Sequence, residues 1–276
     1  RKKIAIVGAG IFGCTLAFML NKKFNVSIFE KQDDILNEAS KMNQFRFHLG
    51  FHYPRSIKTI KETQKSYKDF LNFYGKDIYG ATKNYYGLSK IKNKTNFKTY
   101  KKILIKNNLN YKKINNSEIF SKKIEGVILT KEKILNYFKF KKKINKLIKK
   151  NKIKIYFNRE FKYQDKKKFD KIYLTTYKNN NIVLKNIGEK PSIKYRYELV
   201  EKLVIKLPKK YSNLSVVVLD GKFLCVDPYI GTKYHLLSHV KYSKIKILKL
   251  IFFNFKKKYK KYFKFKNKKN KKISQF

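Results

Sequence analysis

The chain has few of the residues that mark several common protein classes. Its 276 residues include two cysteines, four prolines and no tryptophan. Two cysteines cannot build a disulfide framework, so a reducing compartment is expected. No apolar run reaches the roughly eighteen residues needed to cross a bilayer, and the glycine-interrupted N-terminus does not have the pattern of a signal peptide. The cytoplasm is the predicted location.

Acidic residues and arginine are also scarce. Eighteen Asp and Glu stand against 69 Lys and Arg, which gives a formal charge of +51, but only five of the basic residues are arginine. Selection for phosphate contacts would be expected to enrich arginine, whose planar fork pairs with phosphates and base edges. We therefore predict no specific nucleic-acid partner and expect most lysines to be solvated surface.

The first thirty residues contain the most informative motif. An apolar run over residues 4–7 leads into Gly8-Ala9-Gly10-Ile11-Phe12-Gly13, an apolar helix pattern follows, and a second apolar run over 26–29 ends at Glu30. This order predicts a dinucleotide-binding turn. Gly8 permits the tight turn, Gly10 lets the backbone approach a diphosphate, and Gly13 allows close helix packing. Glu30 is expected to bind a ribose diol, which disfavours NADP because of its 2′-phosphate.

The rest of the chain alternates between helical and strand patterns. Together they predict an α/β fold in which a Rossmann-like domain is interleaved with a mixed, mainly antiparallel β-sheet domain. The expected first domain covers residues 1–82 and 131–178, and the second covers 83–130 and 179–243. Residues 244–276 are expected to form a basic, aromatic helix or tail, with weak contact to an anionic membrane as its functional alternative. Helices are predicted over 56–74, 97–109 and 131–151, and strands over 85–91, 153–157, 169–176, 195–207 and 214–226.

All four histidines fall in two short segments. His48 and His52 lie within residues 43–56, and His235 and His239 lie within residues 231–239. Histidine and arginine suit the binding and reaction of a small polar or anionic substrate, so we expect both segments to face one pocket. A four-histidine metal site is the rival interpretation. It is disfavoured because no H-E-x-x-H motif is present and the second pair lies in strand-like sequence.

With these residues in view, the chain resembles the FAD-dependent oxidoreductases of the D-amino-acid oxidase and glycine oxidase superfamily. The likeness rests on the glycine motif with Glu30, on Ala39-Ser40-x-x-Asn43, on a strand over 153–160 after a helix near Glu132, and on a returning strand over 169–176. The resemblance implies that FAD is the cofactor and that the mixed β-sheet domain is the substrate or cap domain. It also implies a later glycine-containing segment beside the flavin, and none is expected here because no glycine follows Gly231.

The resemblance assigns residues to the cofactor by position. The glycine turn would hold the diphosphate, and the acid at the end of the second strand would hold the ribose. The loop that follows would lie along the diphosphate and the flavin, and two threonines would close the side of the site next to the phosphates. The cofactor-binding residues so predicted are Gly8, Gly10, Ile11, Phe12, Gly13, Glu30, Lys31, Ser40, Asn43, Gln44, Thr175 and Thr176.

The predicted reaction is transfer of hydride to the flavin from a C–H adjacent to an amine or hydroxyl of a small substrate. Arg46 or Arg55 is expected to pair with an anionic substrate group, and His48, His52 or Tyr53 to contact the reacting carbon or accept a proton. Two alternatives stay open. One is a flavin-dependent mutase or sugar-nucleotide enzyme, and the other is a non-catalytic flavoprotein fold that binds RNA or membranes through its basic surface.

Overall fold

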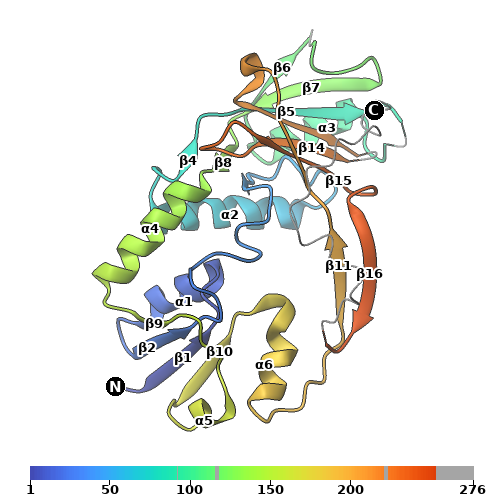
Figure 1. Ribbon diagram of the computed structural model, residues 1–276. Coiled ribbons are helices and arrows are strands. Elements are labelled where there is room, and N and C mark those ends of the chain that lie inside the picture. The colour runs from blue at the N-terminus through green and yellow to red at the C-terminus, as the bar shows by residue number, and fades with distance from the viewer. Residues whose placement is uncertain (92, 116–117, 221–222, 253–276) are drawn as a thin grey trace.

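The computed structural model describes residues 1–91, 93–115, 118–220 and 223–252. Its elements form two blocks, a lower one around a four-stranded sheet and an upper one around a seven-stranded sheet (Figure 1). Helix α2 (Ile57–Tyr74) lies between them and joins their cores, because Ile60 packs in the upper core and Tyr74 in the lower. Ser56 caps its start by accepting a hydrogen bond from the Thr59 amide.

The lower block is a parallel sheet with helices on both faces. Its strand order is β10-β1-β2-β9, and every neighbouring pair is parallel. Such strands are almost continuously apolar because both faces are covered. Helices α1 and α4 (Tyr137–Lys150) pack on one face and α6 (Asn180–Asn186) on the other. The strands are β1 (Lys3–Val7), β2 (Asn25–Phe29), β9 (Lys154–Tyr156) and β10 (Lys171–Leu174), and α1 (Ile11–Leu20) connects β1 to β2.

The upper block is a mixed sheet in the order β12-β15-β14-β13-β5-β7-β6. Only the β13–β5 pair is parallel, and α3 (Phe97–Lys106) packs against this sheet through Phe97, Tyr100 and Leu104. The strands are β5 (Lys83–Ser89), β6 (Tyr111–Ile114), β7 (Ile124–Thr130), β12 (Leu203–Ile205), β13 (Leu214–Leu219), β14 (Leu224–Pro228) and β15 (His235–His239).

Short elements complete the described chain. A three-stranded sheet and the β11–β16 ribbon accompany the two main sheets (Figure 1). These elements are β3 (Arg46–Phe47), β4 (Tyr79–Gly80), β8 (Lys133–Leu135), β11 (Tyr195–Val200), β16 (Lys244–Leu250), α5 (Tyr163–Lys166) and the 3₁₀ turns η1 (Tyr177–Asn179) and η2 (Lys209–Tyr211).

The predicted α/β fold class is confirmed, with differences in individual elements. The helix expected over 131–151 begins only at Tyr137, because residues 133–135 form β8 and Asn136 caps the helix. Residues 244–250 form strand β16 rather than the expected helix or tail, because their lysine and apolar side chains largely alternate and β11 pairs with them. The remainder of the expected tail, residues 253–276, lies outside the described residues. The exact domain limits stay a prediction.

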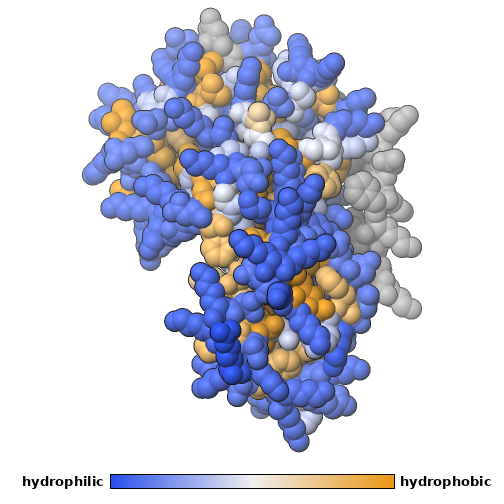
Figure 2. Space-filling view, turned by 90° about the vertical axis from the view of Figure 1, so that its left-hand side faces the viewer, coloured by the Kyte–Doolittle hydropathy of each residue, from blue (hydrophilic) through white to orange (hydrophobic). Residues whose placement is uncertain are grey.

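The surface is dominated by hydrophilic side chains. Figure 2 shows one face covered largely by hydrophilic residues, with apolar surface concentrated where the two blocks meet. Among the described residues, no helix combines the length and apolar character required to cross a membrane.

Candidate functional site

The glycine turn after β1 is built as the motif predicts. Gly8 adopts φ +104°, in the left-handed region, and its amide donates to Phe29 O at 2.8 Å. Gly13 packs so tightly that an added Cβ would lie 1.9 Å from Gly8 O and 2.7 Å from Thr175 Oγ1. The Thr175 hydroxyl donates to the carbonyls of Val7 and Gly8 at 2.9 Å each. Thr175 therefore braces the turn from β10.

Glu30 reaches back to this turn from the end of β2. Its Oε2 accepts the Ala9 amide at 2.7 Å and its Oε1 accepts the Gln32 amide at 3.0 Å. The carboxylate thus lies in the crevice at the carboxyl ends of β1 and β2, where open parallel sheets bind ligands. Lys31 lies next to it and forms an exposed ion pair with Glu38, 4.0 Å from Nζ to Oε1.

Glu38 closes the loop that follows β2. It accepts hydrogen bonds from Gln32 and Lys178, which joins this loop to the segment after β10. Burial alone would raise the Glu38 pKa, but the hydrogen bond and charge of Lys178 outweigh it and the pKa is lowered. Thr176 takes part in local capping there, because both its amide and its hydroxyl donate to Asn180 Oδ1.

The N-terminus of α1 points into the same crevice. Gly10 caps it without a side chain, and no acidic residue lies in the first turn. The Ile11 amide donates to Ser40 Oγ at 3.0 Å, while the Phe12 side chain is 78% exposed. A Cβ on Gly10 would lie 3.4 Å from Ser40 Oγ, so any larger side chain would fill the space in front of the helix.

Asn43 shapes the loop that carries Ser40. Its Nδ2 donates to Ser40 O at 3.1 Å, and its Oδ1 accepts the Phe45 amide at 2.6 Å. The next residue, Gln44, donates from Nε2 to Ser238 Oγ of β15 at 2.8 Å, and its Oε1 is buried with no partner found among the described residues. The loop therefore runs from the start of α1 to the upper sheet.

These donors and acceptors fit an adenine dinucleotide. Helix amides and the positive end of the α1 dipole suit a diphosphate, and a carboxylate beside the turn suits a ribose diol. The residues that could hold the diphosphate and the ribose all come from the glycine turn, β2 and the Ser40 loop.

The Arg46 guanidinium is buried and paired with other side chains of the protein. Its side chain is 3% exposed, with Nη2 2.7 Å from Asp227 Oδ1 and Nη1 3.5 Å from Glu132 Oε2. It also donates to Ser215 Oγ at 2.5 Å and stacks over the Tyr86 ring, 5.3 Å from its centroid. Its guanidinium is therefore bound by two buried carboxylates, and pairing of Arg46 or Arg55 with an anionic substrate group stays a prediction.

His48, His52 and Tyr53 form an aromatic group next to this cluster. The two histidine ring centroids lie 5.4 Å apart, and Tyr53 lies 5.6 Å from His48 and 5.3 Å from His52. Burial lowers the pKa of His48 to about 4 and that of His52 to about 3, and the charge of Arg46 acts in the same direction. Both Nδ1 atoms are buried without a partner among the described residues. Both rings are therefore neutral near pH 7.

Glu132 positions the segment that carries His48. Its Oε1 accepts the Leu49 amide at 2.7 Å and lies 4.0 Å from His48 Nδ1. Burial raises the Glu132 pKa, and Arg46 opposes that shift. Arg55 lies farther out, about half exposed, with Nε 3.5 Å from Asp220 Oδ1.

The second histidine pair does not join the first. Side chains alternate along β15, so His235 and His239 lie on one face of the sheet while Ser238, which contacts Gln44, lies on the other. His239 Nδ1 accepts the amides of Lys241 and Tyr242 in the following turn. The two segments meet through the contact of Gln44 with Ser238, and whether they face one substrate pocket stays a prediction. Within the described ranges no group of three or more His, Cys, Asp or Glu could hold a metal ion.

The residues that enclose Arg46 were not among the site residues predicted from the sequence. These are Tyr86, Glu132, Ser215 and Asp227. One signal in the sequence could have indicated Asp227 as a site residue. It is an acid within an apolar strand pattern, in a chain that has only eighteen acids.

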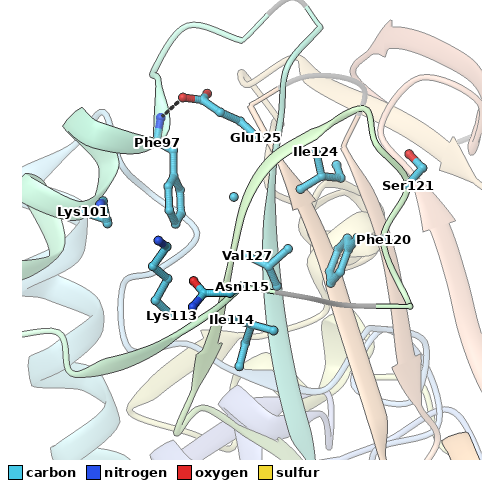
Figure 3. Close-up of a pocket in the computed structure, with 11 residues that line it drawn as sticks. Phe97, Lys101, Lys113, Ile114, Asn115, Phe120, Ser121, Ile124, Glu125 and Val127 are labelled. Atoms are coloured by element: carbon cyan, nitrogen blue, oxygen red, sulfur yellow. Dashed lines mark hydrogen bonds between the residues drawn. The ribbon is translucent and has the colours of Figure 1, made fainter.

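A separate pocket of about 350 Å³ lies between α3 and strands β6 and β7 (Figure 3). Phe97, Lys101, Lys113 and Phe120 line it, and Glu125 accepts the Phe97 amide at 3.0 Å. Figure 1 shows these elements at the top of the upper block, while the glycine turn lies in the lower block. This pocket is therefore not part of the candidate site.

Comparison with known proteins agrees with this geometry. The family model described as FAD dependent oxidoreductase, DAO, matches residues 3–182, and the chain belongs to this family. The FAD-dependent monooxygenase FPY4 of Fusarium mangiferae is 28% identical over 133 residues, which cover 48% of this chain and 36% of that relative. The chain thus matches about a third of the length of this curated relative.

Solved structures show the same fold. Glycine oxidase from Geobacillus kaustophilus superposes with a TM-score of 0.61 at 13% identity, over 87% of this chain and 72% of that one. L-alpha-glycerophosphate oxidase from Mycoplasma pneumoniae, solved with FAD bound, gives 0.61 at 18% identity over 87% and 71%. The predicted superfamily, its fold and FAD as its cofactor are confirmed.

Proposed function

We propose that this chain binds FAD along β1, α1 and β2 and belongs to an oxidoreductase that removes hydride from a C–H adjacent to an amine or hydroxyl of a small polar or anionic substrate. The observation that carries the proposal is the Glu30 carboxylate, bonded to the Ala9 amide beside the exposed N-terminus of α1. That arrangement joins an acceptor for a diol to donors for a diphosphate.

Each part of the crevice has a proposed task. The amides at Phe12 and Gly13 face the diphosphate, the Ile11 amide adjoins it through its hydrogen bond to Ser40 Oγ, and Gly8 and Gly10 leave room for it. Glu30 holds the ribose with Lys31 beside it, Ser40 and Asn43 lie along the diphosphate, and Gln44 lies toward the flavin. Thr175 and Thr176 support the phosphate side through the backbone contacts described above.

Bound FAD would supply the hydride acceptor. The protein's own contribution is a pair of neutral imidazoles, His48 and His52, whose lone pairs can accept the proton that leaves an amine or hydroxyl. Tyr53 contacts both rings and shields them from water. Arg55 is the remaining arginine for an anionic substrate in this segment, at the edge of the site.

Cofactor binding is tested first, with the visible spectrum of the purified protein. We expect flavin absorbance in the native chain and its loss in Gly10→Glu, because a carboxylate would occupy the diphosphate position. Asn25→Glu is the matched control, since it adds the same charge at an exposed position at the start of β2. Flavin retained in Gly10→Glu, with native-like circular dichroism, would refute the proposed site.

The reaction is tested by anaerobic flavin reduction with a panel of amino acids and hydroxy acids. For a substrate that reduces the flavin, we expect His48→Gln or His52→Gln to slow reduction by about 10²-fold or more while flavin content stays unchanged. Unchanged rates in both variants would rule out the histidines as proton acceptors. Sugar nucleotides complete the panel, because thermal protection by them without flavin reduction would favour a mutase.

A further inference from the structure

A lysine lies in one row with two polar residues on the upper sheet. In the pairing of β12 with β15, Leu203 stands opposite Leu237 and Val204 opposite Leu236. Lys202 immediately precedes β12, and continuing this register by one residue places it opposite Ser238. Ser238 in turn stands opposite Cys225 of β14. Directly paired residues project to the same face of a sheet, so Lys202, Ser238 and Cys225 share a face.

This face is the one that meets the candidate site. Ser238 accepts the hydrogen bond from Gln44, in the loop that continues from the cofactor turn. Phe223, two residues before Cys225, has its ring 5.6 Å from that of His52. The row of Lys202, Ser238 and Cys225 therefore lies between the proposed flavin loop and the histidine pair.

Lys202 carries a charge that the protein leaves unpaired. No hydrogen bond or ion pair to its ammonium is found among the described residues, and the residue is only partly buried, so its Nζ keeps access to solvent. Asp227 is nearby, but its two oxygens are bonded to Arg46 and Ser215. Burial lowers the Lys202 pKa to about 8 against the opposing effect of Asp227, and burial raises that of Cys225 to about 12, so the thiol stays neutral. A partly buried cation without a counter-ion is costly, and a bound anion would remove that cost.

We propose that Lys202 is the anion-binding residue of the substrate site, where a carboxylate or phosphate group of the substrate lies beside Ser238 and Gln44. The substrate of the proposed reaction would then be an acid or a phosphate ester, held by Lys202 and not by Arg46. Gln44 Oε1, buried and unpartnered, is free to accept a hydrogen bond from a substrate N–H or O–H. The role of Lys202 in the reaction rests on the proposed function, whereas the binding of an anion by Lys202 does not.

The test is isothermal titration calorimetry of the intact, FAD-treated chain with acetate, inorganic phosphate and neutral acetamide, at an ionic strength fixed with sodium chloride. We expect Lys202→Met to weaken binding of acetate or phosphate at least ten-fold. Lys209→Met, an exposed lysine in η2, should bind like the native chain and thereby controls for the general basic surface. The anion that binds more tightly identifies the substrate class as carboxylate or phosphate.

The pH dependence provides a second readout. The titratable groups that act on Lys202 are the Asp227 carboxylate and the Cys225 thiol, both on β14. Because the ammonium must be protonated to bind an anion, affinity should fall as the pH rises through about 8, and this fall should be absent from Lys202→Met. Lys202→Arg should retain binding, and Lys202→Gln replaces Lys202→Met if the latter does not fold.

Two outcomes would overturn the assignment. The assignment is wrong if the native chain and Lys202→Met bind anions with equal affinity. It is also wrong if the native chain binds acetate and acetamide with equal affinity. Flavin content, read from absorbance in each sample, keeps the two proposals apart. Anion binding through Lys202 without flavin contradicts only the proposed function, whereas flavin binding without a Lys202 effect contradicts only the anion site.

Discussion

The two halves of the site hold their polar groups in different ways. At the glycine turn, backbone amides and one partly buried carboxylate come from the first thirty residues, and Ala9 to Glu30 is the central contact. At the upper sheet, Arg46 is enclosed by Glu132 and Asp227, which come from distant parts of the chain. The first arrangement is local and leaves donors open for a ligand, while the second is long-range and internally neutralised. A rare charged residue in a motif is therefore not by itself a ligand-binding residue.

The largest expected effect is the loss of the buried ion cluster. Arg46→Met would leave Glu132 and Asp227 buried without their cation, and we expect unfolding free energy to fall by about 3–5 kcal/mol. Urea denaturation measures this. Arg196→Met is the control, because its pair with Glu198 is exposed and should change stability by less than about 1 kcal/mol. Similar losses of unfolding free energy in both variants would show that the buried cluster stabilises the fold no more than an exposed ion pair does.

Two glycines of the turn have different roles, because Gly13 is required for helix packing and Gly10 for cofactor binding. Gly13→Ala places a methyl group 1.9 Å from Gly8 O, so α1 must shift, and we expect a loss of about 3 kcal/mol in the same denaturation assay. Gly10→Ala meets only an ordinary contact at 3.4 Å and should fold normally. Its FAD affinity should fall about ten-fold, equal to about 1.4 kcal/mol, because the methyl group enters the diphosphate space. Normal stability in Gly13→Ala would contradict the close packing described here.

The smallest effect is a pH dependence of stability from the histidine pair. The pKa values of His48, about 4, and His52, about 3, lie below the ordinary 6.5, so the unfolded chain takes up protons first as the pH falls. Unfolding free energy should therefore decrease from about pH 6.5 down through about pH 4 and on to about pH 3.

Each histidine contributes at most about 1.4 kcal/mol per pH unit in that window. His52→Gln should make the slope shallower by up to this amount at pH 5, as measured by denaturation at several pH values. The comparison must use the difference between native and variant proteins, because burial raises the pKa of Glu132 and Asp227 and their slope has the opposite sign. An unchanged slope would mean that His52 is protonated equally in both states.

Much of the lower block could be predicted from the sequence, because its contacts are short-range. The turn at Gly8, the Glu30 carboxylate and the helix after Gly10 follow each other along the chain, and each conformation has a residue type that requires it. The end of the described chain was predicted less well. Residues 244–250 were expected to be a helix or tail, but they form strand β16, which depends on pairing with β11, about fifty residues earlier.

The sequence alone determined the cofactor class and the fold of the first block, since a glycine turn, a helix start and an acid at a strand end form a nearly contiguous unit. Only the tertiary structure decided which charged residues are available to a substrate. Arg46 is satisfied by carboxylates that lie 86 and 181 positions away along the chain. Lys202 directly precedes β12, whose register with β15, continued by one residue, places it opposite Ser238. Strand register and burial set these partners, and neither can be read from local residue order.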